Sequence, residues 1–561
     1  MKITPCCESI KRIRYGMPRL VRSAVIGLGI AGALSCTPRA NVGAQSPSPP
    51  LPAVSGAAMD AHLKYLADDL LEGRAPATRG GELAARYIAA QFEALGLAPG
   101  AADGSYYQPV TLVGLMPRPA MRWGGAGTPG SLRYLDDFVA WSERPSAAVS
   151  AKGEVVFVGY GIRAPEWKWD DYKDVDLRGK LLLMLVNDPG MQDSTIFQGR
   201  TLTYYGRWTY ELEEAGRRGA MGAILIHTTE SATYPWDVVR GSWSVEQFML
   251  DGARGTGLEC AGWVTEQAAR AVLRDARLDF DSLVRSAARR SFRPVRTGIQ
   301  AEISIASKLR RVPSSNVVAR VSGENPVLRS QVVLVTAHYD HKGIGPPVNG
   351  DSIYNGAEDN ASGVAAMLGL AQALMHDPAP RKRSVLFIAT TAEESGLLGS
   401  QAYVEKPLAP LSGTAAVVNV DVANVRGATR DIAVLGGDRS TLGTLFKDAA
   451  ARESLTATGD PDPTRGSFFR SDHFPFARAG VPAISVESGV EFVGRPVGWG
   501  EQQSRMYNEQ RYHEPTDEYR SDFRYEGMVQ EVRVVLQLIR ALASDSSLPK
   551  WLPGSEFQRT P

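Results

Sequence analysis

Short hydrophobic runs alternate with helical patterns in the C-terminal half of the chain. Runs of strand length occupy residues 316–321, 331–336, 384–389, 415–420, 431–435 and 483–486. Apolar residues at helical spacing separate several of them, over residues 362–375, 398–406, 440–452 and 526–543. This alternation predicts an α/β fold with a mostly parallel central sheet and helices on both faces.

The N-terminal half has a different pattern. Residues 59–71 and 80–95 show helical spacing, and Gly96 follows as a C-cap. Glycine and proline are frequent over residues 98–130, which predicts connecting loops. Residues 150–300 predict a separate β-rich unit, with strands at 155–158, 181–186 and 222–226 and a helix at 210–219. Its one histidine, His227, ends a buried strand and is interpreted as structural.

The first 45 residues have the composition of an export signal. Basic residues precede a compact apolar run over 24–34, and small residues and a Pro/Ser-rich stretch follow. The run is shorter than a membrane-spanning helix needs, so cleavage is favoured over the alternative of an uncleaved anchor. Residues 42–44 fit cleavage by signal peptidase, whereas residues 33–36 resemble a lipoprotein box that would leave Cys36 as a lipid anchor. We therefore expect an exported protein, periplasmic or extracellular, either free or held at a membrane as a lipoprotein.

Charge and cysteine content narrow the class further. Residues 1–44 carry seven Lys and Arg and one Glu, and the whole chain has a formal charge of +1, so the remainder is near −5. A mildly acidic protein has no basic surface for a polyanion, which argues against nucleic acid as a partner. Cys260 is the only cysteine after Cys36, so the exported part has no cysteine pair, and we expect Cys260 to be buried and structural.

Residues of metal-ligand type follow several predicted strands. The segments are His338-Tyr-Asp340, Asp359-Asn360, Glu393-Glu394, Asp421 and Tyr512-His513. Ligands gather at the carboxyl ends of the strands in open α/β sheets, so these side chains should meet at one edge. Taken alone, Asp359 is better explained as a helix cap. The whole set, with two imidazoles and several carboxylates, is the inventory that a two-zinc hydrolytic site needs.

These segments resemble, in residue type and order, the zinc metallopeptidase family of bacterial leucyl aminopeptidase and glutamate carboxypeptidase II. The motifs that carry the resemblance are His338-Tyr-Asp340, residues 355–363, residues 391–396, Asn419-Val-Asp421, Ser471-Asp-His473 and residues 512–517. The likeness is strong over residues 305–545 and loose over 57–130. The β-rich unit, through residues 159–162 and 219–225, resembles the protease-associated domain often inserted in this family.

The resemblance implies a zinc aminopeptidase-like fold and a division of the chain into parts. We expect a signal peptide (1–44), a flexible linker (45–56), an N-terminal part of the catalytic domain (57–145), a protease-associated domain (146–300), the zinc peptidase catalytic domain (301–545) and a tail (546–561).

The resemblance also implies a role for each site residue. Asp359 would bridge two Zn²⁺ ions, His338 and Asp421 would complete one of them, and Glu394 and His513 would complete the other. Glu393 would be the general base. The family also has a cis peptide after the bridging aspartate, here Asp359–Asn360.

The resemblance implies roles for other residues of these motifs as well. Asp340 would accept a hydrogen bond from His338 and fix its tautomer. Tyr512 would donate to the developing oxyanion, as in the carboxypeptidase branch, with simple packing as the alternative. Asp517 would orient His513. His473 and His341 are left out of the ligand set, which is complete without them.

The expected reaction is hydrolysis of peptide substrates at their N-terminal residue. An aminopeptidase is preferred because the carboxypeptidase branch binds substrate carboxylates with several arginines, and only Arg465 and Arg470 lie near a motif here. The alternatives that stay open are a carboxypeptidase or dipeptidase of the same family, a glutaminyl-cyclase-like acyltransferase with one zinc, and a receptor-like binding protein without activity. The sequence does not predict the preferred residue or the oligomeric state.

Overall fold

The computed structural model describes residues 49–125, 129–253, 255–545 and 547–558. The predicted signal peptide and the predicted lipid-anchor residue Cys36 lie outside these residues. Within the described ranges, no helix is both long and apolar enough to cross a membrane.

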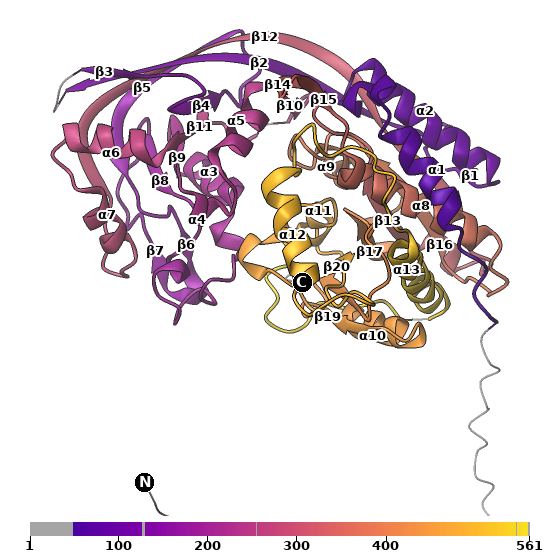
Figure 1. The fold of residues 1–561 in the computed structure, drawn as a ribbon. Coiled ribbons are helices and arrows are strands. Elements are labelled where there is room, and N and C mark those ends of the chain that lie inside the picture. Colours follow the sequence, from indigo (N-terminus) through magenta and orange to yellow (C-terminus); the bar gives the residue numbers. More distant parts are fainter. Residues whose placement is uncertain (1–48, 126–128, 254, 546, 559–561) are drawn as a thin grey trace, which may run out of the picture. The chain divides into compact units, whose positions relative to one another are not determined.

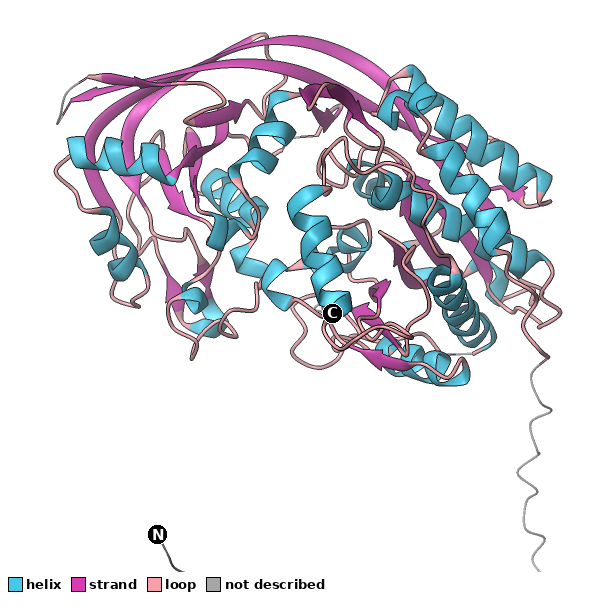
Figure 2. Ribbon diagram, viewed as in Figure 1, coloured by secondary structure: helices cyan, strands magenta, loops and turns pink. Residues whose placement is uncertain are grey.

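The C-terminal half is built on a mostly parallel sheet, as the sequence predicts (Figures 1 and 2). Its centre is formed by four parallel strands in the order β20, β17, β13, β16. Strand β12 pairs antiparallel with β16 on one side, and β18 pairs antiparallel with β20 on the other, followed by β19. The bounds are β12 Val295–Val321, β13 Val332–His338, β16 Ser384–Thr390, β17 Thr414–Val420, β18 Asp431–Leu435, β19 Thr456–Thr458 and β20 Ala483–Ser488.

Helices cover both faces of this sheet because its strands are apolar on both sides. Along β13, Val333 and Val335 belong to the core shared with α1, α2, α8 and α13, whereas Val332 and Leu334 belong to the core shared with α9 and α11. Helix α8 is buried nearly all round, which fits its almost wholly apolar sequence. The bounds are α1 Gly56–Leu66, α2 Arg79–Ala94, α8 Gly363–Met375, α9 Leu398–Glu405, α10 Leu442–Arg452, α11 His473–Arg478, α12 Trp499–Gln510 and α13 Glu526–Ser544.

The β-rich unit has its own parallel strands in the order β5, β8, β9, β11, with β4 antiparallel at the edge. The strands predicted at 155–158, 181–186 and 222–226 are confirmed as parts of β5, β8 and β9. The bounds are β4 Phe138–Trp141, β5 Ala148–Phe157, β6 Arg163–Ala164, β7 Trp169–Asp170, β8 Leu181–Leu185, β9 Gly222–His227, β11 Cys260–Thr265, α3 Trp208–Arg217, α4 Thr229–Ala232, α5 Trp236–Ser244, α6 Glu266–Asp275 and α7 Phe280–Ala287.

The prediction of loops over residues 98–130 is wrong. Strand β2 (Tyr107–Gly125) occupies most of this segment and pairs with β12 over nearly its whole length, so the two long strands run side by side (Figure 1). Pro117 and Pro119 obscured the alternating pattern. They lie between the stretches of β2 that pair with β10 (Gln247–Leu250) and β3 (Gly130–Leu132). There β12 is the one neighbouring strand among the described residues, and an edge position tolerates proline. Strand β12 also crosses the expected domain boundary at residues 300 and 301 without a break.

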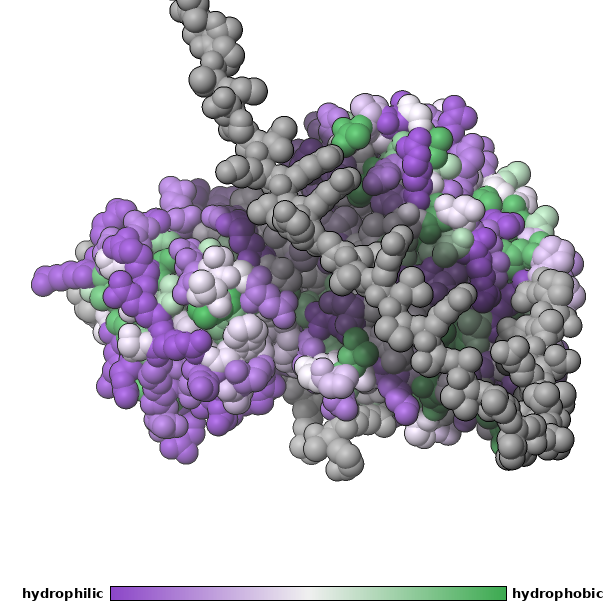
Figure 3. Space-filling model, turned by 90° about the horizontal axis from the view of Figure 1, so that it is seen from below, coloured by the Kyte–Doolittle hydropathy of each residue, from purple (hydrophilic) through white to green (hydrophobic). Residues whose placement is uncertain are grey.

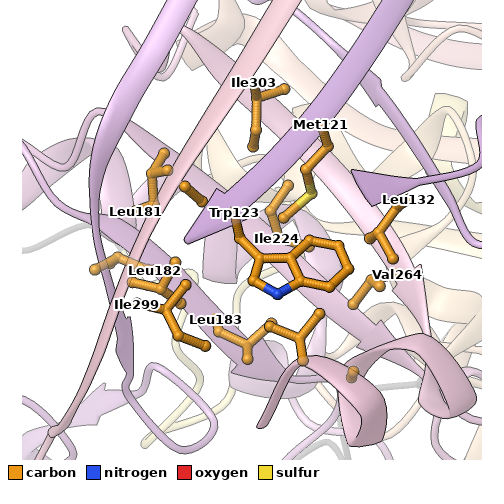
Figure 4. A pocket seen from close by; sticks show the side chains of 14 residues that line it. Met121, Trp123, Leu132, Leu181, Leu182, Leu183, Ile224, Val264, Ile299 and Ile303 are labelled. Atoms are coloured by element: carbon orange, nitrogen blue, oxygen red, sulfur yellow. The ribbon is translucent and has the colours of Figure 1, made fainter. Parts of the chain in front are cut away.

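The core of the β-rich unit contains a cavity of about 30 Å³, lined by apolar side chains such as Met121, Trp123 and Ile303 (Figure 4). This is room for about one water molecule, and no titratable side chain lines it, so it is a packing void rather than a reaction site. Cys260 is free and buried in the same core, as predicted. On the face shown in Figure 3, hydrophilic residues predominate over this unit.

Candidate metal centre

The five predicted ligands come together at the carboxyl edge of the central sheet. His338 is the last residue of β13, Asp421 directly follows β17, and Glu394 lies in the loop after β16. Asp359 lies in a short helical segment, η6 (Ala357–Ser362), that precedes α8, and His513 lies in the loop after α12. Parallel strands that end at the same edge therefore deliver most of the site, as the sequence predicts.

Each imidazole faces two carboxylate oxygens at metal-ligand spacing. His338 Nε2 lies 3.2 Å from Asp359 Oδ1 and 3.2 Å from Asp421 Oδ1. His513 Nε2 lies 3.5 Å from Asp359 Oδ2 and 3.1 Å from Glu394 Oε2. Ligand atoms bound to one tetrahedral Zn²⁺ at about 2.0–2.2 Å are roughly 3.3–3.6 Å apart, so both sets fit this ion. Asp359 offers one oxygen to each imidazole, which is the arrangement of a bridging carboxylate.

Glu394 is held by two further basic side chains. His341 Nδ1 lies 2.6 Å from Glu394 Oε1, and Lys342 Nζ lies 2.9 Å from Glu394 Oε2. Burial opposes ionisation of Glu394, but the surrounding His513, Lys342 and His341 outweigh it and hold the pKa of this carboxyl well below its usual value. Glu394 is therefore an anion, as a metal ligand must be.

Glu393 lies beside the His338 and Asp421 pair. The ligand atoms of these three residues lie within 4.8 Å of one another, and Glu393 is buried. Burial raises the pKa of Glu393 well above its usual value; the charge of His338 opposes this shift, and the charge of Asp421 reinforces it. Ala392 has a φ of 54°, and this turn before Glu393 lets adjacent glutamates make different contacts.

The contacts of Asp340 differ from the expectation. His338 Nδ1 lies 3.1 Å from the backbone carbonyl of Asp340 and donates there, whereas the Asp340 carboxylate oxygen is 3.9 Å from it. The tautomer of His338 is thus fixed by a backbone oxygen, which leaves Nε2 free for a metal. The Asp340 carboxylate instead accepts a hydrogen bond from the backbone N–H of Glu393 at 3.1 Å. The carboxylate of Asp340 therefore positions the proposed base, whereas its backbone carbonyl positions the ligand His338.

Asp517 also has a different partner from the expected one. Its carboxylate accepts hydrogen bonds from the backbone N–H groups of Glu358 and Asp359, each at 3.0 Å, and not from His513. The peptide between Asp359 and Asn360 is cis, as the resemblance implies. A side chain at Gly356 would lie 2.1 Å from the Asp359 carbonyl oxygen, so this tight loop requires glycine there.

The Ser471-Asp-His473 motif touches the centre through its serine. Ser471 Oγ donates to Asp421 Oδ2 at 2.6 Å, which leaves Oδ1 toward His338. Asp472 is buried and accepts a hydrogen bond from the hydroxyl of Thr390. His473 packs against Phe468, and neither of its ring nitrogens has a hydrogen-bond partner among the described residues. Burial lowers the pKa of His473 to about 3, so this residue is a neutral core histidine.

Tyr512 lies against the His513 ring. The two rings stack with centroids 3.8 Å apart, and the guanidinium of Arg465 lies 5.8 Å from the centre of the Tyr512 ring. Burial raises the pKa of Tyr512 well above its usual value, so the phenol keeps its proton and can donate a hydrogen bond. Its hydroxyl forms no hydrogen bond with another residue in the described part of the chain, so the structure leaves this donor available.

The centre buries more carboxyl groups than basic groups, and burial raises the pKa of Asp340, Glu393 and Asp472, which a bound cation would oppose. Its buried or nearly buried carboxyl groups outnumber the basic groups beside them. These carboxyl groups belong to Asp340, Asp359, Glu393, Glu394, Asp421 and Asp472. Uncompensated buried carboxylates cost several kcal/mol each. Nitrogen and oxygen donors at tetrahedral spacing fit Zn²⁺. An α/β sheet with this centre at its carboxyl edge defines the class of metal-dependent hydrolases.

Comparisons with known proteins agree with this class. Residues 316–539 match the family described as Peptidase family M28. The chain is 29% identical over 211 residues to aminopeptidase YwaD of Bacillus subtilis (36% of this chain, 39% of the relative). It is 26% identical over 277 residues to a probable leucine aminopeptidase 2 of Aspergillus oryzae (46% and 51%). The fold is similar to that of an aminopeptidase from Aneurinibacillus sp. strain AM-1, with a TM-score of 0.51 and 19% identity over 88% of this chain and 95% of that one.

Residues 316–539, two fifths of the chain, therefore carry a similarity to peptidase family M28. The matched stretches span between two fifths and about half of the two curated relatives. The central-sheet fold expected from the resemblance is confirmed.

Some residues of the centre were not expected from the sequence. Arg74 is buried and donates to the backbone carbonyls of Tyr339, Asn355 and Gly356, so it ties together the loops that carry His338 and Asp359. Nothing in the local sequence of Arg74 distinguishes it from a surface arginine. Lys342 was missed because a lysine is not a metal ligand, although its position four residues after His338 was a usable signal.

Proposed function

We propose that this protein is an exported two-zinc aminopeptidase. One observation carries the two-metal part of the proposal: Asp359 offers Oδ1 to His338 and Oδ2 to His513. His338, Asp421 and Asp359 would hold one Zn²⁺, and His513, Glu394 and Asp359 the other. When bound, such ions polarise a scissile carbonyl and acidify the attacking water.

The protein's own residues would supply the proton transfers. Glu393 would accept a proton from the attacking water at its carboxylate and then deliver it to the leaving amine. The hydrogen bond from its backbone to Asp340 holds the loop that carries this carboxylate. The hydroxyl of Tyr512 would donate to the oxyanion that develops on the substrate.

The preference for a free α-amine rests on charge and on the relatives. Both curated relatives reported above are named as aminopeptidases. Glu487 on β20 is a further, half-buried carboxylate, and the charge of Asp421 adds to the effect of desolvation in raising its pKa. Binding of a substrate with a protonated α-amine would be favoured beside these carboxyl groups, because opposite charges attract.

One observation favours a second candidate, a dipeptidase or carboxypeptidase. Among the described residues, no carboxylate forms an ion pair with Arg465 or Arg470, whereas Arg426 and Arg511 both pair with Glu358. Arg465 lies beside Tyr512, and Arg470 lies beside Tyr234 of the β-rich unit with its guanidinium 5.3 Å from the ring centre. An arginine guanidinium that has no carboxylate partner among the described residues suits a substrate carboxylate.

The test is hydrolysis by the zinc-loaded protein of amino-acyl anilides, N-acetylated peptides, free dipeptides and amidated dipeptides. An aminopeptidase cleaves the anilides and both dipeptides but not the blocked peptides, and a chelator abolishes turnover. Cleavage of free dipeptides alone supports a dipeptidase, and cleavage of N-acetylated peptides at a free carboxyl end supports a carboxypeptidase. One zinc per chain by elemental analysis would point to the cyclase-like acyltransferase, and two zincs without turnover to a binding protein.

The proposal also includes export of the protein and the assignment of the β-rich unit as a protease-associated domain. The order of basic, apolar and small residues over positions 1–44 supports export to the periplasm or the extracellular space. N-terminal sequencing of the protein from its native cells would give a start at Gln45, or a blocked Cys36 if it is a lipoprotein. An intact Met1 would contradict export by cleavage.

A further inference from the structure

The two candidate metal positions differ in their surroundings. At the first position, Asp421 receives a neutral partner, the hydroxyl of Ser471, at 2.6 Å. At the second, Glu394 receives the ammonium of Lys342 at 2.9 Å on Oε2, the same oxygen that faces His513. Within the described ranges, no lysine or arginine forms an ion pair with Asp421 or Asp359. The carboxylates of the first position therefore have no lysine or arginine partner, whereas Glu394 of the second position is shared with the ammonium of Lys342.

This ammonium is placed where solvent cannot screen it. The side chains of Lys342 and Glu394 are only 10% and 5% exposed. His341 occupies the other oxygen of Glu394 at 2.6 Å, so the carboxylate cannot turn away from Lys342 without breaking a second contact. In a buried site the repulsion between an ammonium and a nearby divalent ion is far stronger than in water. An ion pair with Lys342 also withdraws electron density from the oxygen that the metal would use.

We propose that the centre binds its two cations with unequal affinity, and that Lys342 weakens the position formed by Glu394 and His513. This inference rests on the proposed two-zinc function but concerns binding rather than turnover. The first cation then remains bound, whereas occupancy of the second follows the concentration of free metal. Activity of such an enzyme would rise with zinc supply, and Lys342 is the residue that sets the threshold.

The experiment is a zinc titration of the metal-stripped full-length chain against a competing chelator, with bound zinc per chain as the readout. The wild type should take up zinc in two resolved steps. Lys342→Met should shift the second step to about 10–100-fold lower free zinc, the range by which partners of metal ligands change affinity. The first step should stay in place. Lys342→Arg keeps the charge and should keep a weak second step.

The exposed Lys447 on α10 provides the matched control, because Lys447→Met removes a lysine from a helix that carries no proposed ligand and should leave both steps unchanged. Far-UV circular dichroism of each variant checks that it is folded. Two equal steps in the wild type, or a weaker second step in Lys342→Met, would overturn the inference while leaving the two-zinc function intact. Uptake of a single zinc at saturating metal would instead remove the proposed function itself.

Discussion

Two regions of this molecule bury carboxylates, and they do so in opposite ways. In the β-rich unit, Asp171 accepts hydrogen bonds from the backbone of Ile162 and the indole of Trp169, and Asp188 accepts one from the hydroxyl of Thr203. Burial raises the pKa of each of these aspartates to about 7, so below that pH they are protonated in the fold. At the carboxyl edge of the central sheet, buried carboxylates instead face imidazole nitrogens.

The difference shows that burial of acids does not by itself indicate a metal site. His227, the one histidine of the β-rich unit, turns its Nε2 to the backbone carbonyl of Tyr234, 3.0 Å away, and not to an acid. At the carboxyl edge of the central sheet, His338 and His513 each keep Nε2 toward two carboxylate oxygens. An imidazole nitrogen that faces carboxylate oxygens distinguishes a cation site from a group of protonated acids.

The largest difference in activity is expected when one acid is removed from each region. Glu393→Gln keeps the size of the side chain but removes the base, so kcat should fall by about 10²- to 10⁴-fold. Bound zinc per chain should not change, because Glu393 is outside the ligand set. Elemental analysis and anilide hydrolysis on the same sample measure both quantities.

Glu211→Gln is the matched control, because Glu211 is also buried but lies on α3 of the β-rich unit. This variant should keep full activity. Normal turnover by Glu393→Gln would remove Glu393 from the mechanism, and a comparable loss in Glu211→Gln would remove the distinction between the two regions.

A second comparison removes one histidine from each region. His338→Ala deletes a nitrogen that faces two carboxylates, so zinc affinity should fall by more than the roughly 10–100-fold that loss of a ligand's hydrogen-bond partner costs. His227→Ala should leave zinc affinity unchanged and cost only stability. Competition with a chelator measures the first effect and thermal unfolding the second. Equal zinc binding by the two variants would contradict the assignment of His338 as a ligand.

A smaller effect is expected from the loop that carries Asp359. Asp517→Asn replaces one of two acceptor oxygens with an amide that cannot accept, so one buried backbone N–H of the pair at Glu358 and Asp359 loses its partner. Leaving such a donor unsatisfied costs about 1–3 kcal/mol of stability. We expect activity to fall by about tenfold, because the bridging carboxylate is less well held.

Tyr507→Phe is the control for this change, since its hydroxyl makes only a long contact, 3.5 Å, with the same carboxylate. It should retain most of the activity. If Asp517→Asn binds zinc and turns over like the wild type, the hydrogen bonds to the loop are not needed to place Asp359.

The sequence predicted ligand types better than their contacts. His338, Asp421 and Glu394 were predictable because each follows a buried apolar strand, and parallel strands end at one edge. The partners of Asp340 and Asp517 were not, because whether a carboxylate bonds a ring nitrogen or a backbone N–H depends on loop geometry that residue spacing does not fix. Strand β2 was missed for a similar reason, since prolines tolerated at an edge read as loop signals in a sequence.

The smallest effect tests the protonated state of the acids in the β-rich unit. The pKa of Asp171 is raised from 3.8 to about 7 by burial, so the folded chain holds a proton between about pH 4 and pH 7 that the unfolded chain has released. Stability should therefore decrease as pH rises through this window. Asp171→Asn removes the titration, so the fall in melting temperature between pH 4 and pH 8, measured by calorimetry, should become shallower.

Asp176 on the same unit gives a control of opposite sign, because its hydrogen bonds with Arg178 lower the pKa of its carboxyl to about 2. Its contribution is lost only as pH falls below about 4, so Asp176→Asn should not alter the slope between pH 4 and pH 8. An unchanged slope in Asp171→Asn would mean that this aspartate is ionised in the fold. Burial without an imidazole would then no longer distinguish the acids of the β-rich unit from those of the metal centre.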